Sequence, residues 1–159
     1  MSVARSIAEV DEYYDAYVDS LRRWGDAATA QYPRTLFHEL FRLQEENRGV
    51  RFWLGYLEAR VVSGVLVLYH GDHSVVWHAA THSDYLKSGA SPYVHTAAIR
   101  AACSDGLRWY DFNPSDHLRG VEFFKEGFRA QRLRFDMYHS PNFTQSVAPA
   151  DAALTEDVA

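Results

Sequence analysis

The residues of this chain best suited to chemistry lie in the stretch GLRWYDFNPSDHLRGVEFFKEGF. An aromatic-rich strand runs into Asp111, Asn113 and Ser115, and Lys125 follows on a short apolar segment. Asp111 can accept a proton or bind a cationic amine, while Asn113 and Ser115 can donate hydrogen bonds to a carbonyl oxygen. The ammonium of Lys125, with its stem along an apolar surface, can stabilise a developing negative charge. These residue types suit proton transfer and the stabilisation of a negative charge.

Each of these features also has a structural interpretation. Asp, Asn, Pro and Ser in succession form turns by hydrogen bonding to their own backbone. A lysine at the end of a helix is stabilised there by the helix dipole. The two interpretations of Asp111 and of Lys125 therefore both stay open at the level of sequence.

A second candidate region is the start of the helix expected over SPYVHTAAIRAACSDG. The free N–H groups at a helix N-terminus bind phosphate or carboxylate groups. Lys87, Gly89 and Ser91 lie at this start, although many helices begin with Ser-Pro and bind nothing. If the helix start holds a ligand, we expect these three residues to contact its phosphate or carboxylate group.

Polar side chains on two neighbouring strands raise the question of a metal site: His70, Asp72, His73, His78 and His82. Their spacing matches no known ligand pattern, and the two-residue period of a strand divides them between its faces. No metal site is predicted. Cys103 lies late in a helix, where the dipole opposes a thiolate, so we expect it in the core and not as a nucleophile.

Composition bounds the class of protein. The 159 residues are 47% hydrophobic and 14% aromatic, which predicts one packed domain over residues 1–140, followed by a small, polar, disordered tail over 141–159. The net charge of −5 argues against a DNA-binding protein, although residues 117–135 are net basic and suit either a phosphate-bearing ligand or a solvated face. No apolar run is long enough for a membrane span. One cysteine and the absence of a secretory pattern predict a cytoplasmic protein.

The hydrophobic spacing predicts the elements that must position these side chains. Two helices come first, one stopped by Gly25 and one entered at Pro33. Three strands follow as an antiparallel meander: RFWLGYLEA, VVSGVLVLYH and HSVVWHAA. A helix capped by Ser91 and ended by Gly106, a strand LRWYDF, a short helix GVEFFKEG and a strand RLRFDMY complete the chain. The order ααβββαβαβ predicts an α/β (α+β) domain, a mixed sheet with helices on both faces.

This order resembles the GNAT acyltransferase fold. Three stretches resemble, more narrowly, the C-terminal lobe of Fem-type aminoacyltransferases, the peptidoglycan-bridge enzymes: SLRRWGDAATAQYP, VVWHAATHSDY and LRWYDFNPSDHLRGVEFFKEGF. The resemblance implies direct transfer of an acyl group from aminoacyl-tRNA or acyl-CoA to an amine, without a covalent enzyme intermediate. The acceptor it implies is a small molecule or a peptidoglycan-type amine.

The resemblance also implies roles for single residues. Lys125 would stabilise the tetrahedral oxyanion and Phe124 would form the wall beside it, with Asp111 as the second catalytic candidate. The substrate would contact Phe124, Asn113 and Ser115. The donor would contact Lys87, Gly89, Ser91 and Arg129.

Three departures from the family patterns keep alternatives open. Fem-like proteins carry two GNAT-like lobes where this chain has one, and their Phe-Gly-Gly after the lysine is here Phe128-Arg129-Ala130. The acyl-CoA fingerprint of ordinary GNAT proteins lacks its second glycine in LKSGASPY. A non-catalytic lobe that binds a partner is therefore the alternative function, and a homodimer that supplies the second lobe would reconcile the two.

Overall fold

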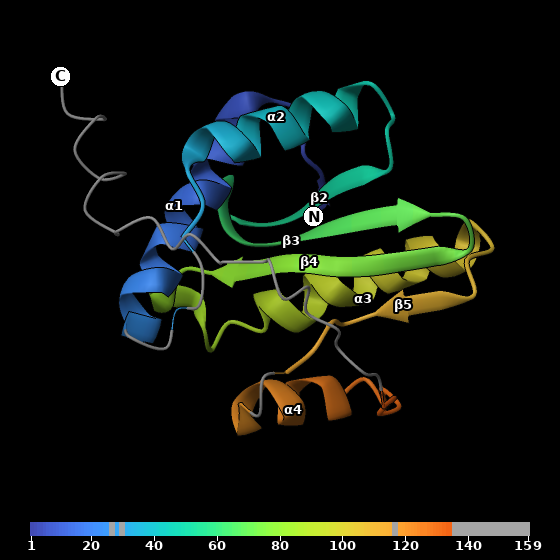
Figure 1. Cartoon of the computed structure of the whole chain (residues 1–159). Helices are drawn as coiled ribbons and strands as arrows, with labels where there is room; N and C mark the ends of the chain where they lie inside the picture. Colours follow the sequence, from blue (N-terminus) through green and yellow to red (C-terminus); the bar gives the residue numbers. More distant parts are fainter. Residues whose placement is uncertain (26–27, 29–30, 116–117, 135–159) are drawn as a thin grey trace, which may run out of the picture. The chain divides into compact units, whose positions relative to one another are not determined.

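The computed structural model describes residues 1–25, 28, 31–115 and 118–134, which Figure 1 draws in colour. The chain divides into two compact units, Met1–Asn113 and Pro114–Ala159. The expected tail over 141–159 lies outside the described residues, as does most of the expected last strand. Its described part, residues 132–134, is not a strand.

The predicted order of elements is confirmed as far as the short helix at residues 119–126, with one strand added at the start and without the expected last strand in the described residues. The first unit holds β1 (Ser2–Val3), α1 (Ile7–Trp24), α2 (Arg34–Glu45), β2 (Val50–Leu57), β3 (Arg60–His70), β4 (His73–Thr81), the 3₁₀ helix η2 (Ser83–Tyr85), α3 (Ala90–Ser104) and β5 (Trp109–Asp111). The described part of the second unit holds α4 (Arg119–Glu126). β1 was not predicted because two residues are too short to show a period.

The five strands form one mixed sheet in the order β1-β2-β3-β4-β5. The first three pairings are antiparallel, and β4 pairs with β5 in parallel. Bulges interrupt the β2–β3 pairing beside Gly55 and the β3–β4 pairing between Leu66 and Val67. This is the mixed sheet that the sequence predicted, with its parallel pair at the edge.

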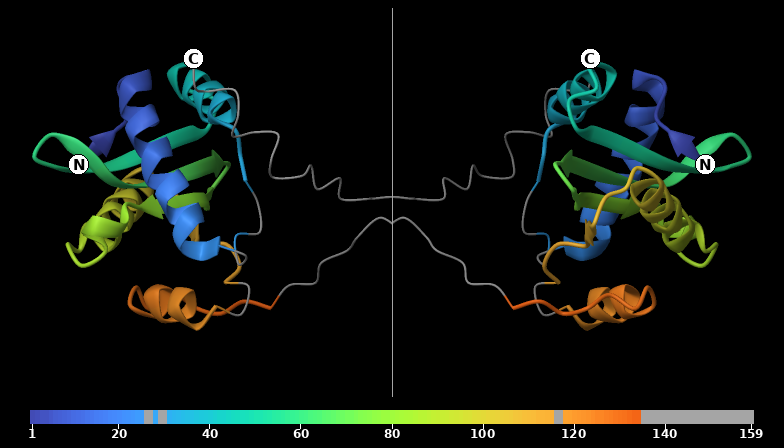
Figure 2. Two further views of the ribbon diagram at one scale, coloured as in Figure 1. Left: turned by 90° about the vertical axis from the view of Figure 1, so that its left-hand side faces the viewer. Right: turned by 90° about the vertical axis from the view of Figure 1, so that its right-hand side faces the viewer.

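Helices cover both faces of the sheet (Figures 1 and 2). α1 and α2 lie on one face, against β2, β3 and β4, and α3 lies on the other, mainly against β2 and β3. Seven consecutive residues of β3, Val61 to Val67, are buried. That burial explains its almost continuous apolar run, because a strand covered on both sides has no solvent face.

The ends of the helices follow local chemistry. The side chain of Ser6 accepts a hydrogen bond from the N–H of Glu9 at the start of α1, and Gly25, with φ of 52°, ends the helix as predicted. At α3 the predicted cap is wrong. The capping residue is Gly89, in the left-handed conformation with φ of 77°, and Ser91 lies inside the first turn. The hydroxyl of Ser88 accepts from the N–H of Ala90, and Ser88 therefore makes the capping hydrogen bond that was expected of Ser91.

The second unit contains a short helix with an exposed apolar residue. α4 ends at Gly127, as predicted, and the N–H of Gly127 donates to the carbonyl of Phe123. Phe123 is 78% exposed, whereas Phe124 is half-buried and packs edge-on against Phe128, with ring centroids 5.2 Å apart.

Candidate functional site

The parallel strands β4 and β5 separate soon after they begin. They pair only from His73 to Val75 and from Trp109 to Asp111, although β4 continues to Thr81. Separation coincides with the β3–β4 bulge, where Leu66 pairs with His78 and Val67 with Val76, so that Trp77 is the additional residue. A bulge bends its strand away from the flat sheet. In the described part of the chain, no strand pairs with residues 76–81 on the β5 side, so the sheet is open toward its carboxyl end, where ligands bind in α/β folds.

The loop that follows β4 delivers the start of α3 to this end of the sheet. In this β4–α3 loop (residues 82–89), a Cβ built on Gly89 meets no atom within 4 Å, so the loop backbone there is accessible. A surface pocket of about 260 Å³ lies beside it, lined by Gly55, Val62, Ser88, Gly89 and Tyr93 among others. Lys87 is exposed and Ser91 half-buried. The structure thus brings Gly89 to a hollow at a helix N-terminus, a position favourable for a phosphate.

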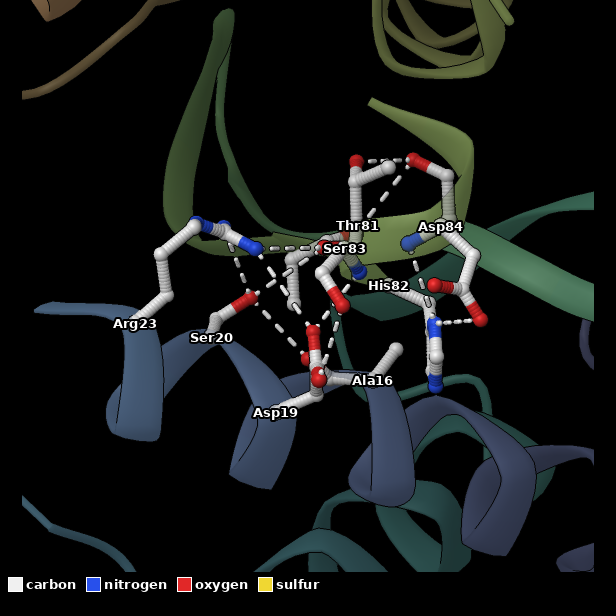
Figure 3. Close-up of polar contacts among 10 residues, drawn as sticks. Ala16, Asp19, Ser20, Arg23, Thr81, His82, Ser83 and Asp84 are labelled. Atoms are coloured by element: carbon white, nitrogen blue, oxygen red, sulfur yellow. Dashed lines mark hydrogen bonds and ion pairs between the residues drawn. The ribbon is translucent and has the colours of Figure 1, made fainter. Parts of the chain in front are cut away.

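A polar cluster ties α1 to the end of β4 and to the β4–α3 loop (Figure 3). The carboxylate of Asp19 accepts two hydrogen bonds from Ser83, one from its backbone N–H at 2.7 Å and one from its hydroxyl at 3.1 Å. Arg23, one turn further along α1, lies 3.6 Å from Asp19 and donates to the carbonyl of Thr81 at 3.3 Å. We call Asp19, Ser20, Arg23, Thr81 and Ser83 the α1 clasp.

Within the α1 clasp, Ser20 and Thr81 are buried and hydrogen-bonded to each other. The hydroxyl of Ser20 donates to the carbonyls of Ala16 and Thr81, and it accepts from Arg23. From the neighbouring strand, the hydroxyl of Ser63 lies 2.7 Å from that of Thr81. Thr81 is therefore held from both the helix side and the sheet side. Sequence reasoning assigned no role to these residues; an Asp and an Arg four positions apart on α1 were the available signal.

A partly buried histidine lies further back along β4. The Nδ1 atom of His78 is 2.7 Å from the hydroxyl of Tyr13, and the imidazole is surrounded by the rings of Tyr13, Tyr17 and Phe37. Burial lowers the pKa of His78 to about 4, so the ring is neutral at neutral pH. On the opposite face of the sheet, Nδ1 of His95 lies 3.2 Å from the hydroxyl of Tyr110.

Asp111 and Asn113 form the turn that was the structural alternative. The N–H of Asn113 donates to Oδ1 of Asp111 at 2.7 Å, and Asn113 adopts a left-handed φ of 65°. Both side chains are exposed at the carboxyl end of β5. The turn holds the Asp111 carboxylate in place without removing it from solvent.

Lys125 is anchored within the second unit. Its Nζ donates to the carbonyl of Pro114 at 2.9 Å, and the carbonyl of the adjacent Ser115 accepts from the N–H of Leu118. Arg129 is exposed with φ of 57°, and Arg132 pairs with Glu126 at 2.7 Å and with Glu122 at 3.5 Å. Convergence of Lys125 with Asp111 on one reaction centre stays a prediction.

Two further expectations concern metals and Cys103. Among the described residues, no group of three or more His, Cys, Asp or Glu side chains is arranged to hold a metal ion. Cys103 is exposed near the end of α3, so the expectation that it lies in the core was wrong. The helix turns Ala102 toward the sheet in its place.

Within the described residues, no helix is long and apolar enough to cross a membrane.

The sequence matches a known family over most of its length. The match is to the family described as Acetyltransferase (GNAT) domain, and it covers residues 1–126. The chain belongs to the GNAT acetyltransferase family. As a GNAT domain it is an acyltransferase by class, which confirms that part of the sequence prediction.

Solved structures agree on the fold. A possible acetyltransferase from Clostridium difficile 630 is 12% identical, with 89% of this chain and 96% of that chain covered and a TM-score of 0.69. An aminoglycoside acetyltransferase from an uncultured soil metagenomic sample, in complex with sisomicin, is 11% identical over 87% and 95%, with a TM-score of 0.62. A PaiA N-acetyltransferase from Thermoplasma acidophilum, in complex with coenzyme A, is 10% identical over 80% and 89%, with a TM-score of 0.64. No curated protein sequence matches the chain.

Proposed function

We propose that this GNAT domain transfers an acyl group from acyl-CoA directly to the amine of a small molecule, as a cytoplasmic enzyme. The observation that carries the proposal is the separation of β4 from β5 after Val75, together with a helix N-terminus at the same end of the sheet. Strands that part in this way leave room for an extended thioester arm. The exposed backbone at Gly89 suits the pyrophosphate at the other end of the donor.

Two observations support CoA over tRNA as the donor. A solved structural neighbour was determined in complex with coenzyme A. Within the second unit, Arg132 is already paired with Glu122 and Glu126, which reduces the positive charge that a nucleic acid would need. An aminoacyl-tRNA donor, as in Fem-like enzymes, is the competing proposal, and Arg129 would then contact it.

The proposed roles of the site residues follow from their chemistry. An ammonium acceptor first gives one proton to Asp111. The neutral nitrogen then attacks the thioester carbonyl, the C–S bond breaks, and CoA leaves as a thiolate that takes up the second proton lost by that nitrogen. Asp111, exposed at the end of β5, binds the ammonium form of the acceptor and accepts a proton. Lys125 stabilises the oxyanion, Phe124 lies beside the acyl group, and Asn113 and Ser115 donate to the acceptor.

The acceptor class is proposed from the same site. One structural neighbour was solved with the aminoglycoside sisomicin bound, which is a small molecule with several amines. An exposed carboxylate such as that of Asp111 attracts this kind of cation. A peptidoglycan-type amine is the alternative acceptor, and a second GNAT-like lobe from a homodimer would then complete the site.

A titration separates the donors. We expect CoA to bind saturably to the full chain, measured by calorimetry, with little dependence on salt beyond that of its own phosphates. Binding of tRNA that is steeply salt-dependent and weakened by neutralising Arg129, while CoA does not bind, would replace the CoA proposal with the Fem-like one.

The catalytic role of Lys125 is tested by Lys125→Met with a panel of amines. Loss of one oxyanion donor lowers kcat by roughly 10²–10³-fold, so we expect a loss of that order with unchanged CoA binding. Arg119→Met, on the same helix, is the matched control and should leave kcat unchanged. If the wild-type chain acylates no amine, and Lys125→Met changes neither binding nor stability, the alternative of a non-catalytic binding lobe is supported. Light scattering then shows whether that lobe is a homodimer.

A further inference from the structure

We infer that Asp19 is a positioning residue that holds the β4–α3 loop in the conformation that binds the phosphates of the donor. The inference rests on the proposed function and extends it to a helix on the opposite face of the sheet from α3. Nothing in the sequence pattern of the loop itself marks Asp19, which lies more than 60 positions before Ser83.

The contact between Asp19 and Ser83 fixes both backbone and side chain. Oδ2 of Asp19 accepts from the backbone N–H of Ser83 at 2.7 Å, and Oδ1 accepts from its hydroxyl at 3.1 Å. Hydrogen bonds to an ionised carboxylate are roughly twice as strong as those between neutral groups. Because one partner is a main-chain N–H, Asp19 restrains the path of the loop and not only a side chain.

Hydrogen bonds between residues close in the sequence extend this restraint along the loop to Gly89. Leu86 N–H donates to the carbonyl of Ser83, and Ser88 N–H and hydroxyl both donate to the carbonyl of Tyr85. The Ser88 hydroxyl then accepts from the N–H of Ala90, the first residue of α3. A continuous series of local turns therefore joins Ser83 to the helix N-terminus, so a displacement at Ser83 moves the backbone that would face the donor.

The rest of the α1 clasp fixes the other end of the loop. Thr81, which directly precedes it, is held by Ser20 and Arg23 from α1 and by Ser63 from β3. The N–H of His82 also donates to the carbonyl of Val62 at 3.0 Å, so without Asp19 the chain would still be anchored through His82, but α1 would no longer restrain it at Ser83. Asp19 thus fixes the direction in which the loop leaves the end of β4.

Asp19 keeps its charge at neutral pH. Burial raises the pKa of its carboxyl. The two hydrogen bonds from Ser83 and the nearby His82 and Arg23 lower the pKa by more than burial raises it, so it lies below its ordinary value. The carboxylate is 23% exposed and faces Arg23 at 3.6 Å. The charged form that binds Ser83 is therefore the form present when the donor binds.

The test compares Asp19→Ala with a matched control on the same helix. Asp15, one turn earlier, is 67% exposed and pairs with Arg34 of α2, so Asp15→Ala removes an acidic side chain without touching the loop. The donors are acetyl-CoA and an acetyl-pantetheine thioester, which lacks the pyrophosphate. We expect Asp19→Ala to raise the KM for acetyl-CoA roughly tenfold or more, with kcat nearly unchanged and no rise for the truncated donor. Asp19→Asn, whose amide oxygen still accepts from the Ser83 N–H, should recover part of the loss.

Hydrogen exchange gives a readout that does not need activity. Amides of residues 83–90 should exchange faster in Asp19→Ala than in the wild type or Asp15→Ala, while those of β3 should not change. Unchanged exchange in the loop, or an equal loss with both donors, overturns the inference and leaves the proposed function standing. A wild-type chain that binds no CoA refutes the proposed function first, and the inference with it.

Discussion

The two faces of the sheet are packed with different kinds of side chain. On the face covered by α1 and α2, the core is aromatic and centred on Tyr13, Phe37 and Phe52, all three completely buried. On the face covered by α3, the buried core is smaller and consists of valine and alanine side chains, with Trp53, Tyr69 and Tyr110 only partly buried against it: Val65, Val67, Val76, Val94 and Ala98. The sheet contributes to both sets, Phe52 to the first and Val65, Val67 and Val76 to the second, because successive side chains of a strand point to opposite faces.

This difference indicates that the two faces contribute differently to stability and to the position of α3. Large rings bury the most apolar area, so the α1–α2 face contributes most of the hydrophobic stabilisation. Small side chains allow α3 to approach closely, and a Cβ built on Gly55 would lie only 2.7 Å from Cγ2 of Val94. The α3 face thus determines where the helix N-terminus lies, and with it the proposed donor site.

The largest effect is expected for Phe37→Ala. Its ring contacts Tyr13, Tyr14, Tyr17 and Phe52, and the cavity left behind should lower the free energy of unfolding by about 3–5 kcal/mol. The counterpart on the other face, Val94→Ala, removes two methyl groups and should cost about 2 kcal/mol. Urea denaturation measures both. Equal losses would contradict the division between the faces.

The aromatic face should also respond to acid. The pKa of His78 is about 4 in the folded chain, below the ordinary value of 6.5, because burial disfavours the imidazolium. Between pH 6.5 and about 4 the unfolded chain takes up a proton that the folded chain does not. The free energy of unfolding therefore falls as the pH falls through this window, by roughly 3 kcal/mol from this group, with no further loss from it below pH 4.

Two variants isolate that dependence. His78→Asn removes the titrating group, so its unfolding free energy should fall less over the same window. The exposed His70 on β3 is the control, and His70→Asn should keep the wild-type dependence. Parallel curves for His78→Asn and the wild type would show that the loss comes from other groups.

Much of the fold followed from the sequence because its elements are locally determined. The glycine stops at Gly25 and Gly106 and the almost continuous apolar run of β3 each have one local cause, and each is confirmed. The cap of α3 was wrong because two serines flank Gly89, and only the backbone conformation decides which hydroxyl meets an orphan N–H. β1 could not be predicted, since its pairing with β2 is a long-range contact of two residues.

The candidate site was harder to predict because it is assembled from distant parts of the chain. Gly89 and the Asp111–Asn113 turn were named from short motifs, and the structure puts both at the carboxyl end of the sheet. Asp19 and Arg23 were missed, since a helical Asp–Arg pair normally indicates a solvated face. Their partners, Ser83 and Thr81, lie about 60 residues away and become neighbours only in the folded chain.

A pair of glycine substitutions tests the two faces with the same chemical change. Gly64 lies on the aromatic face, where a Cβ would meet the ring of Tyr13 at 2.6 Å, and Gly55 lies against Val94 on the α3 face. Overpacking typically costs about 1–3 kcal/mol, so Gly64→Ala and Gly55→Ala should destabilise by similar amounts in urea.

Their effects on CoA affinity should differ, because only Gly55→Ala displaces the first turns of α3. Adding Val94→Ala to Gly55→Ala makes room for the new methyl group and should restore affinity. If Gly64→Ala weakens CoA binding as much as Gly55→Ala does, the donor site responds to general loss of packing, and the special role of the α3 face is refuted.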